Sequence, residues 1–93
     1  MSGALEGAAW RRDPDLPFQK LEEETIVVDP RRREVHLLND TAAQVWELLE
    51  SPQSVDGLVA SLAEAYDAPE DELRGAVVEL LSGLEQKGLL LPA

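Results

Sequence analysis

The chain has 93 residues, 44 % of them hydrophobic and 29 % charged, which is the composition of one soluble globular domain and not of a disordered segment. It has no cysteine and a single histidine, so a disulfide framework, a thiol nucleophile and a structural zinc site are excluded, and nothing indicates an oxidising compartment. No apolar run approaches the roughly 18 to 20 residues that span a bilayer, and the N-terminus lacks the pattern of a signal peptide. We therefore expect a cytoplasmic protein without a membrane segment.

The charge of the chain is strongly negative and unevenly distributed. Nineteen Asp and Glu residues against eight Lys and Arg residues give a net charge of −11. Residues 1–39 carry eight acids and six bases, whereas residues 40–93 carry eleven acids and only two bases, Arg74 and Lys87. This charge repels the phosphates of nucleic acids and anionic membrane surfaces at long range, so neither is an expected partner.

Residues 1–16 lack apolar periodicity of either the helical or the strand type. We interpret them as a flexible N-terminal arm that precedes a folded domain over residues 17–93. Two roles are open for Trp10 in this arm, an anchor that holds the arm on the domain or a contact residue for a partner, and anchoring is the simpler one.

Three short runs of β type follow the arm, at residues 18–21, 25–28 and 34–38. The first alternates apolar and polar residues, and the second is β-branched throughout. The turn signal Asp29-Pro30-Arg31-Arg32-Arg33 joins the second run to the third as a hairpin. The pattern predicts a three-stranded antiparallel meander.

Three helical segments come after the strands. The first begins near Asn39-Asp40-Thr41, any of which can cap it, and the second follows Ser54 and extends over about residues 55–66. The third begins at Pro69 and runs for about 18 residues to Lys87-Gly88, a typical C-terminal signature. We therefore predict an α+β fold, similar to a winged helix-turn-helix, in which a three-stranded antiparallel sheet precedes three helices.

Apolar residues at strand and helix spacing predict the hydrophobic core. The expected core residues are Leu37, Val45, Trp46, Leu49, Leu58, Leu62, Leu73, Val77, Leu80 and Leu84.

Catalysis and cofactor binding have little support in the residues. His36 has neither a second histidine nor a cysteine with which to form a dyad. The acids Glu70, Asp71 and Glu72 stand at a predicted helix start, where they stabilise the positive end of the dipole. The chain has no Gly-rich phosphate loop, no calcium loop and no metal-ligand spacing. We expect no enzyme activity, no metal site and no cofactor.

DNA binding, which is common among winged-helix folds, is disfavoured by the charge. The second helical segment contains no Lys or Arg, and the third has Arg74 and Lys87 at opposite ends. A recognition helix needs such side chains at base edges and phosphates. Only Arg31-Arg32-Arg33 on the hairpin turn could form a basic wing.

Binding of a polypeptide is the function that the residues support best. A meander has two edges whose unpaired N–H and C=O groups can accept an added strand. Val78 and Leu81 widen the apolar stripe of the third helical segment, and a wide stripe beside a strand edge can form a peptide groove. A larger core or a homodimer seam explains the stripe equally well. A self-associating structural or regulatory module therefore remains the alternative.

The stretch from Val35 to Leu49 resembles the signature of the PqqD-like family. In that family an apolar strand end runs into Leu-Asn-x-Thr-Ala and then into a helix with an aliphatic residue, Trp and Leu-Leu, as in Leu38-Asn39-Asp40-Thr41-Ala42 and Val45-Trp46-Glu47-Leu48-Leu49. Residues 54–66 resemble the family's second helix and residues 77–90 its third helix and exit, so the likeness covers about residues 17–91. One departure is Glu50-Ser51-Pro52-Gln53, where members commonly have a Gly.

The resemblance implies a recognition element for ribosomally made, post-translationally modified peptides, which acts as a peptide chaperone and not as an enzyme. Such a domain holds the leader peptide of a precursor and presents the rest to a modifying enzyme, often a radical S-adenosylmethionine enzyme, in the synthesis of pyrroloquinoline quinone or another product. In that family the leader pairs with the third strand and lies against the third helix. Carried over by position, this implies backbone pairing along Glu34, Val35, His36, Leu37 and Leu38, and side-chain contacts from Arg74, Val77, Val78 and Leu81.

Overall fold

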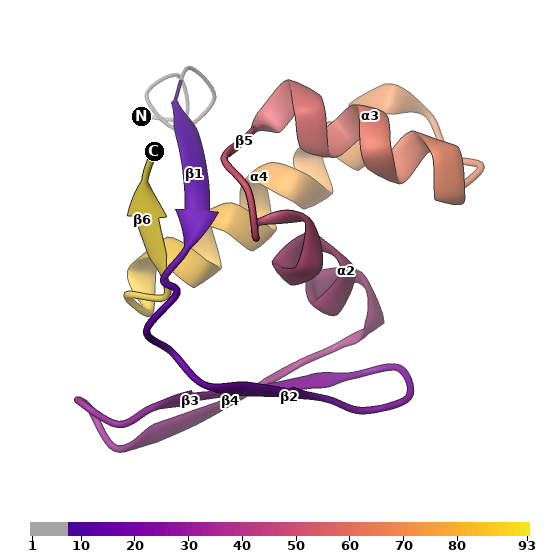
Figure 1. Cartoon of the computed structure of the whole chain (residues 1–93). Helices are drawn as coiled ribbons and strands as arrows, with labels where there is room; N and C mark the ends of the chain where they lie inside the picture. Colours follow the sequence, from indigo (N-terminus) through magenta and orange to yellow (C-terminus); the bar gives the residue numbers. More distant parts are fainter. Residues whose placement is uncertain (1–7) are drawn as a thin grey trace.

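The computed structural model describes residues 8–93, which form two small antiparallel sheets and three helices (Figure 1). The order of elements confirms the predicted α+β fold, because three strands of one sheet precede the three helices. None of the helices in this part of the chain has the length and apolarity that a membrane crossing requires. The elements are β1 (Ala9–Arg12), β2 (Phe18–Lys20), β3 (Thr25–Asp29), β4 (Glu34–Leu38), α2 (Asp40–Leu48), β5 (Gln53–Ser54), α3 (Val55–Ala65), α4 (Glu70–Gln86) and β6 (Leu90–Pro92).

Strands β2, β3 and β4 form the predicted meander, which lies beneath α2 in Figure 1. Phe18 pairs with Val27, and Val27 pairs with His36, so these three side chains share the face that turns toward the helices. Val27 is fully buried there, and the Phe18 ring meets the Trp46 ring edge-on with 6.0 Å between centroids. The sheet therefore packs against the helices through its inner face, where Val27, Thr25 and Leu38 are buried.

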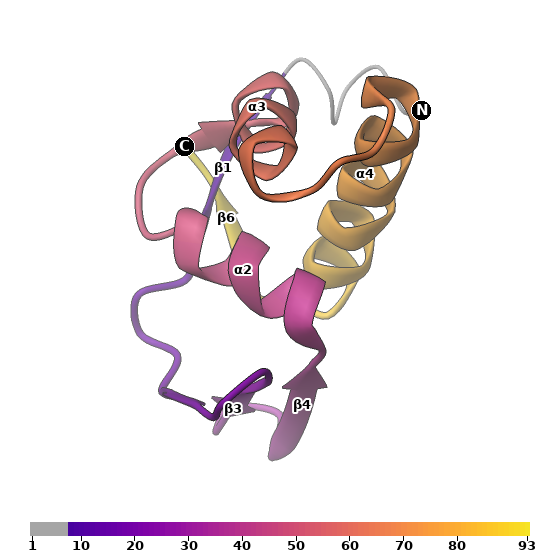
Figure 2. The same ribbon diagram turned by 90° about the vertical axis from the view of Figure 1, so that its right-hand side faces the viewer.

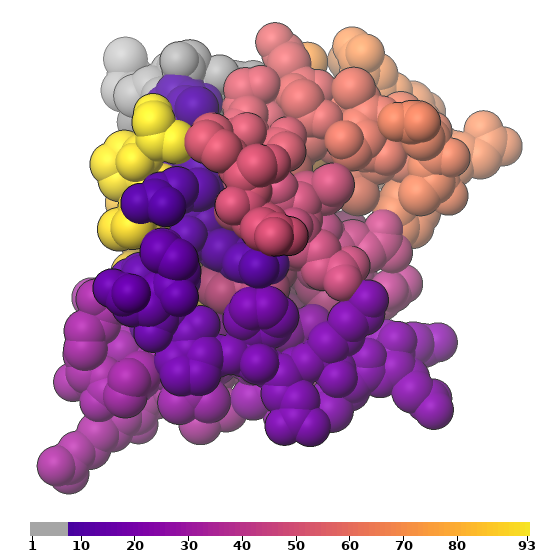
Figure 3. Space-filling model, in the orientation of Figure 1, coloured from indigo at the N-terminus to yellow at the C-terminus, as the bar shows by residue number. Residues whose placement is uncertain are grey.

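A second sheet, with the order β5-β1-β6, was not expected from the sequence. Trp10 pairs with Gln53 on one side and with Pro92 on the other, so β1 is its central strand. In Figure 3, β1 is wedged between the C-terminal strand and the connection from α2 to α3. This differs from the flexible arm predicted over residues 1–16, of which residues 1–7 lie outside the described residues. Trp10 packs against the core, in agreement with the anchoring role.

The two sheets are linked by Arg12 at the end of β1. Its guanidinium lies 4.5 Å from the Phe18 ring centroid and 5.8 Å from that of Trp46, and it donates a hydrogen bond to the Trp46 carbonyl at 3.0 Å. A cation over two aromatic rings that also bonds a backbone carbonyl is held in one place. Trp46 itself is fully buried at the centre of the core.

Eight of the ten predicted core residues are buried, and two are not. Leu37 is 61 % exposed, because side chains alternate along β4 and Leu37 lies on the sheet face that turns away from the helices. Leu80 is only partly buried, and Leu81 takes its place in the core. The buried row on α4 is Leu73, Val77, Leu81 and Leu84.

The helix ends follow the sequence signals. The side chains of Asn39 and Ser54 accept hydrogen bonds, each at 3.0 Å, from backbone N–H groups in the first turns of α2 and α3. At the end of α4, the N–H of Leu89 donates to the carbonyl of Leu84, which closes the helix with Gly88 in the left-handed region at φ +74°.

Candidate peptide-binding site

Strand β4 lies at an edge of its sheet, and no other strand of residues 8–93 pairs with its outer side. The N–H of Val28 donates to the carbonyl of Pro17, and the N–H of Leu21 donates to that of Glu24. Both bonds show that the even-numbered residues of β3 turn their backbone groups toward β2. Antiparallel pairing alternates, so the odd-numbered residues of β3 bond to β4.

The register then assigns the outward backbone groups of β4. Thr25 stands opposite Leu38, and Val27 stands opposite His36, so these residues of β4 bond inward to β3. Val35 and Leu37 alternate with them, and their N–H and C=O groups point away from the sheet. The edge of β4 thus offers two donors and two acceptors to an incoming strand.

Beside the end of β4 lies a cleft of about 480 Å³ between the junction of β4 with α2 and one face of α4. Figure 2 shows how β4 rises toward the start of α2 with α4 alongside. We call this hollow the β4–α4 cleft. Its lining combines aliphatic residues with four polar ones, two of them charged: Leu37, Leu38, Asn39, Thr41, Ala42, Ala76, Glu79, Leu80, Gly83, Leu84 and Lys87.

The hairpin turn between β3 and β4 is tied to the C-terminal end of α4 by Arg32. Its guanidinium donates to the carbonyl of Lys87 at 3.1 Å. A Cβ atom on Gly88 would lie 3.1 Å from the same guanidinium, and the positive φ of Gly88 also favours glycine. This bond ties the turn before β4 to the end of α4 at Lys87, which also lines the cleft.

Arg31 and Asp29 stabilise the same turn from within. The Arg31 guanidinium lies 3.2 Å from a carboxylate oxygen of Asp13 and 3.4 Å from one of Asp29, and both acids are buried. Burial by itself raises the pKa of the Asp29 carboxyl. The backbone N–H groups of Arg32 and Arg31 and the Arg31 side chain outweigh this effect and hold that pKa below its usual value. Two of the three turn arginines therefore have structural roles.

The structure places the predicted contact residues of α4 in three different environments. Val77 and Leu81 are fully buried in the core, so in this conformation neither side chain is exposed to a peptide. Arg74 and Val78 line a shallow hollow on the neighbouring face, where the Arg74 guanidinium lies 2.6 Å from the Asp56 carboxylate. The aliphatic residues of α4 in the cleft are Ala76, Leu80 and Leu84, none of which was predicted to contact a peptide.

The predicted contact residues of α4 and the residues that line the cleft differ in helical phase. Successive residues of a helix are rotated by about 100°, so Leu80 and Leu81 face different surroundings. Both fit an apolar stripe, and the sequence pattern does not say which of them faces the core. Spacing does not separate them, because Leu80 follows Val77 by three residues and Leu81 by four, and both spacings keep a residue on the same face of a helix.

His36 and Glu34 share the inner face of β4 with Leu38. The Nε2 atom of His36 lies 3.5 Å from a Glu34 carboxylate oxygen, and the His36 side chain is largely buried. His36 and Leu38 use their backbone groups for β3, so of the five residues predicted to pair with a peptide only Val35 and Leu37 present outward groups.

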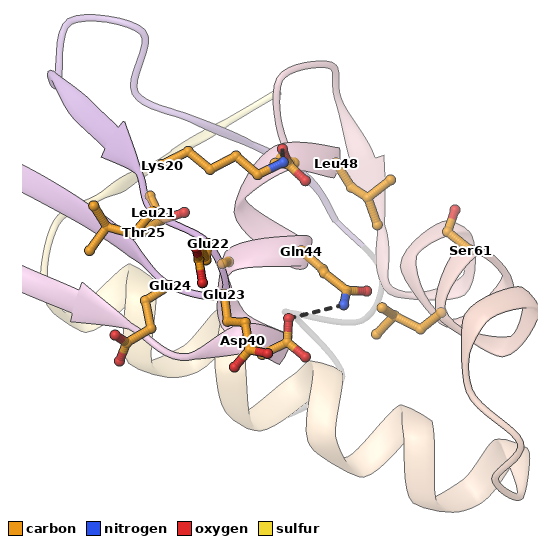
Figure 4. Close-up of a pocket in the computed structure, with 13 residues that line it drawn as sticks. Lys20, Leu21, Glu22, Glu23, Glu24, Thr25, Asp40, Gln44, Leu48 and Ser61 are labelled. Atoms are coloured by element: carbon orange, nitrogen blue, oxygen red, sulfur yellow. Dashed lines mark hydrogen bonds and ion pairs between the residues drawn. The ribbon is translucent and has the colours of Figure 1, made fainter.

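A second hollow, between the β2–β3 loop and helices α2 and α3, has a charged lining (Figure 4). Four of its side chains have polar partners: Lys20 lies 2.7 Å from Glu47, and the Gln44 amide donates to Asp40 at 3.3 Å and to the hydroxyl of the neighbouring Tyr66 at 2.9 Å. Within residues 8–93, no group of three or more His, Asp or Glu side chains could hold a metal ion. The β4 edge and its cleft are therefore the stronger candidate site.

Residues 24–90 match the family model of the coenzyme PQQ synthesis protein D, PqqD. The chain belongs to the PqqD family. This match spans the hairpin, all three helices and the cleft, and confirms the family inferred from the Leu-Asn-x-Thr-Ala junction. No curated protein sequence matches the chain.

Solved structures share the PqqD fold with this chain. TbiB1 in complex with the TbiA(beta) leader peptide has a TM-score of 0.79 at 16 % identity, and the match covers 86 % of this chain and 93 % of TbiB1. Lasso peptide synthetase B1 complexed with its leader peptide has a TM-score of 0.77 at 24 % identity, covering 89 % and 98 % of the two chains. The PqqD part of PqqCD from Methylobacterium extorquens, described as a stand-alone recognition element, has a TM-score of 0.73 at 22 % identity, covering 89 % and 88 %.

Proposed function

We propose that this chain is a peptide chaperone without enzyme activity of its own, which binds the leader segment of a ribosomally made precursor by strand addition to β4. The observation that carries the proposal is the pair of outward-facing backbone units at Val35 and Leu37, directly beside the β4–α4 cleft. Two of the structures with this fold contain leader peptides, which supports a peptide as the occupant.

The backbone bonds at the β4 edge and the side-chain contacts in the cleft contribute differently to the free energy of binding. Val35 and Leu37 offer up to four hydrogen bonds, each contributing about 0.5 to 1.5 kcal/mol net. Association costs roughly 4 to 15 kcal/mol in lost freedom, so the backbone bonds alone give little affinity. Each apolar side chain that enters the cleft adds about 1.5 to 3 kcal/mol. The edge aligns the peptide, and the aliphatic lining selects its sequence.

The bound leader would hold the remainder of the precursor near a modifying enzyme. For that partner we propose the radical S-adenosylmethionine class, on the strength of family membership. We propose the cytoplasm as the compartment, because the chain lacks cysteine.

The test uses synthetic peptides of about 25 residues from the short reading frames that flank the gene, titrated by calorimetry against the whole chain. We expect one of them to bind and its scrambled version to fail. Leu37→Pro should weaken that binding, because it removes an outward donor and obstructs the added strand. The matched control is Lys20→Pro, at an outward-facing position on the opposite edge of the same sheet.

Equal binding by the two proline variants, or no binding by any flanking peptide, would contradict strand addition to β4. The same edge could instead pair with a second copy of the chain. Sedimentation velocity distinguishes this alternative, because a dimer through β4 would dissociate in Leu37→Pro and persist in Lys20→Pro.

A further inference from the structure

The sheet face that turns away from the helices carries a compact apolar patch. Val35 stands opposite Val28, and Leu37 stands opposite Ile26, so the four side chains form a square on that face. Val35 is 67 % exposed and Leu37 61 %, the two highest values among the large hydrophobic side chains of residues 8–93. Ile26 and Val28, one strand further from the edge, are half-buried. Exposure thus increases toward the open edge of β4.

The residues with the most exposed side chains are also those with the outward backbone groups. A strand that bonds to Val35 and Leu37 places the residues opposite them on the same outer face, with Cβ atoms about 4.5 to 5.5 Å away. The residues between these positions point to the inner face, toward the β4–α4 cleft. One added strand therefore meets apolar surface on both of its faces.

We propose that the site selects a peptide segment with apolar side chains at consecutive positions, one set entering the β4–α4 cleft and the other packing on the outer face of the sheet, on Val35 and on Leu37, which also borders the cleft. This inference rests on the proposed function and names the class of peptide that the site accepts. Strict alternation of apolar and polar residues, the usual pattern of a half-buried strand, would leave the outer row without partners.

The size of the patch favours an added strand over a docked protein face. Four side chains cover much less than the roughly 800 Å² per partner that a stable protein interface buries. The patch is adequate as an extension of the β4 edge contact, where the backbone bonds already align the peptide. The gradient of exposure agrees, because only the row next to the edge has large area left to bury.

The experiment selects binders from an mRNA-displayed library of random twelve-residue peptides. Selection on the unaltered chain is followed by removal of peptides that also bind Leu37→Pro. The enriched peptides are then measured against the double variant Val35→Thr/Leu37→Thr. The matched control is Ile26→Thr/Val28→Thr, on the same face but out of reach of an added strand. Threonine keeps the β-branched shape of Val35, Ile26 and Val28 and gives Leu37 a residue that strands favour, and thermal melting verifies folding of every variant.

We expect enriched peptides with apolar residues at three or more consecutive positions. Their affinity should fall about tenfold for Val35→Thr/Leu37→Thr and less than twofold for the control. Selection repeated on Val35→Thr/Leu37→Thr should return peptides that are apolar only at every second position.

Peptides with alternating apolar residues on the unaltered chain, or unchanged affinity for Val35→Thr/Leu37→Thr, would overturn the inference and leave strand addition intact. An equal loss in the control, or a dimer in sedimentation velocity that the Val35→Thr/Leu37→Thr variant abolishes, would overturn it in favour of a protein interface on this face. Absence of any peptide that distinguishes the chain from Leu37→Pro would instead refute the proposed function itself.

Discussion

Replacing Leu80 by Asp should weaken peptide binding and leave the domain folded, whereas the same change at Leu81 should unfold it. The two residues are neighbours on α4 with the same chemistry. Leu81 is fully buried among the three helices, and Leu80 is partly exposed and lines the β4–α4 cleft. Because the two variants differ only in the position of the same substitution, comparing them tests whether Leu80 lines the binding cleft and Leu81 the core.

The structure sets the magnitude of each effect. Truncating a buried leucine to alanine costs about 2 to 5 kcal/mol, and an unpaired buried charge at Leu81 costs more. A chain of 93 residues has a total stability of about 5 to 14 kcal/mol, so Leu81→Asp removes most of it. At Leu80 the carboxylate reaches water in the free domain. In the complex it removes a contact of about 1.5 to 3 kcal/mol and faces an apolar peptide side chain, so affinity falls more than tenfold.

The assay is a urea titration followed by circular dichroism, combined with calorimetric titration of the flanking-frame peptide that binds the unaltered chain. Leu80→Ser serves as the control that removes the contact without adding charge. A folded Leu81→Asp variant would show that the core assignment is incorrect. A folded Leu80→Asp variant with unchanged affinity would remove the cleft from the binding site.

Further predictions concern the turn and the core. Trp46→Ala should lower the free energy of unfolding by about 3 to 5 kcal/mol in urea, because the indole is fully buried; an unaltered midpoint would contradict its central place. Arg32→Ala should weaken peptide binding a few-fold by releasing the turn from the Lys87 carbonyl, whereas Arg33→Ala should not; equal affinities in calorimetry would argue against that tie. The lowered pKa of Asp29 stabilises the fold at pH values above its unfolded pKa of about 3.9, and this stability is lost as the pH falls through the lower folded value. Asp29→Asn should therefore show a smaller drop in melting temperature between pH 5 and pH 2, and an identical drop would count against the stabilised carboxylate.

Local signals predicted the hairpin and the three helices. The β-branched run of β3 and the turn at Asp29-Pro30 are signals contained in a few consecutive residues. Asn39 and Ser54 cap their helices as expected. Strand β1 gave no such signal. Its four residues are all half-buried and show no alternation, and its partners β5 and β6 are more than 40 residues away in sequence. Pairing over that distance is a tertiary effect that a local pattern does not contain.

The sequence pointed to the third strand and the third helix, which also border the cleft, but the structure brings other side chains of α4 to that cleft than the predicted ones. The meander order implied that the third strand would be an edge, and the structure agrees. The choice of Val35 and Leu37 over His36 depends on which β3 residues bond to β2, and a strand pattern alone does not determine this. On α4 the pattern allowed both Leu80 and Leu81, and packing against the other helices decided between them.

Amide hydrogen exchange at the β4 edge tests strand addition most directly. In the free domain, the amides of Val35 and Leu37 should exchange quickly because they point away from the sheet, and that of His36 should exchange slowly because it bonds to β3. A saturating amount of the flanking-frame peptide should slow Val35 and Leu37 to the rate of His36. Peptide binding that leaves the exchange of Val35 and Leu37 unchanged would contradict strand addition to β4.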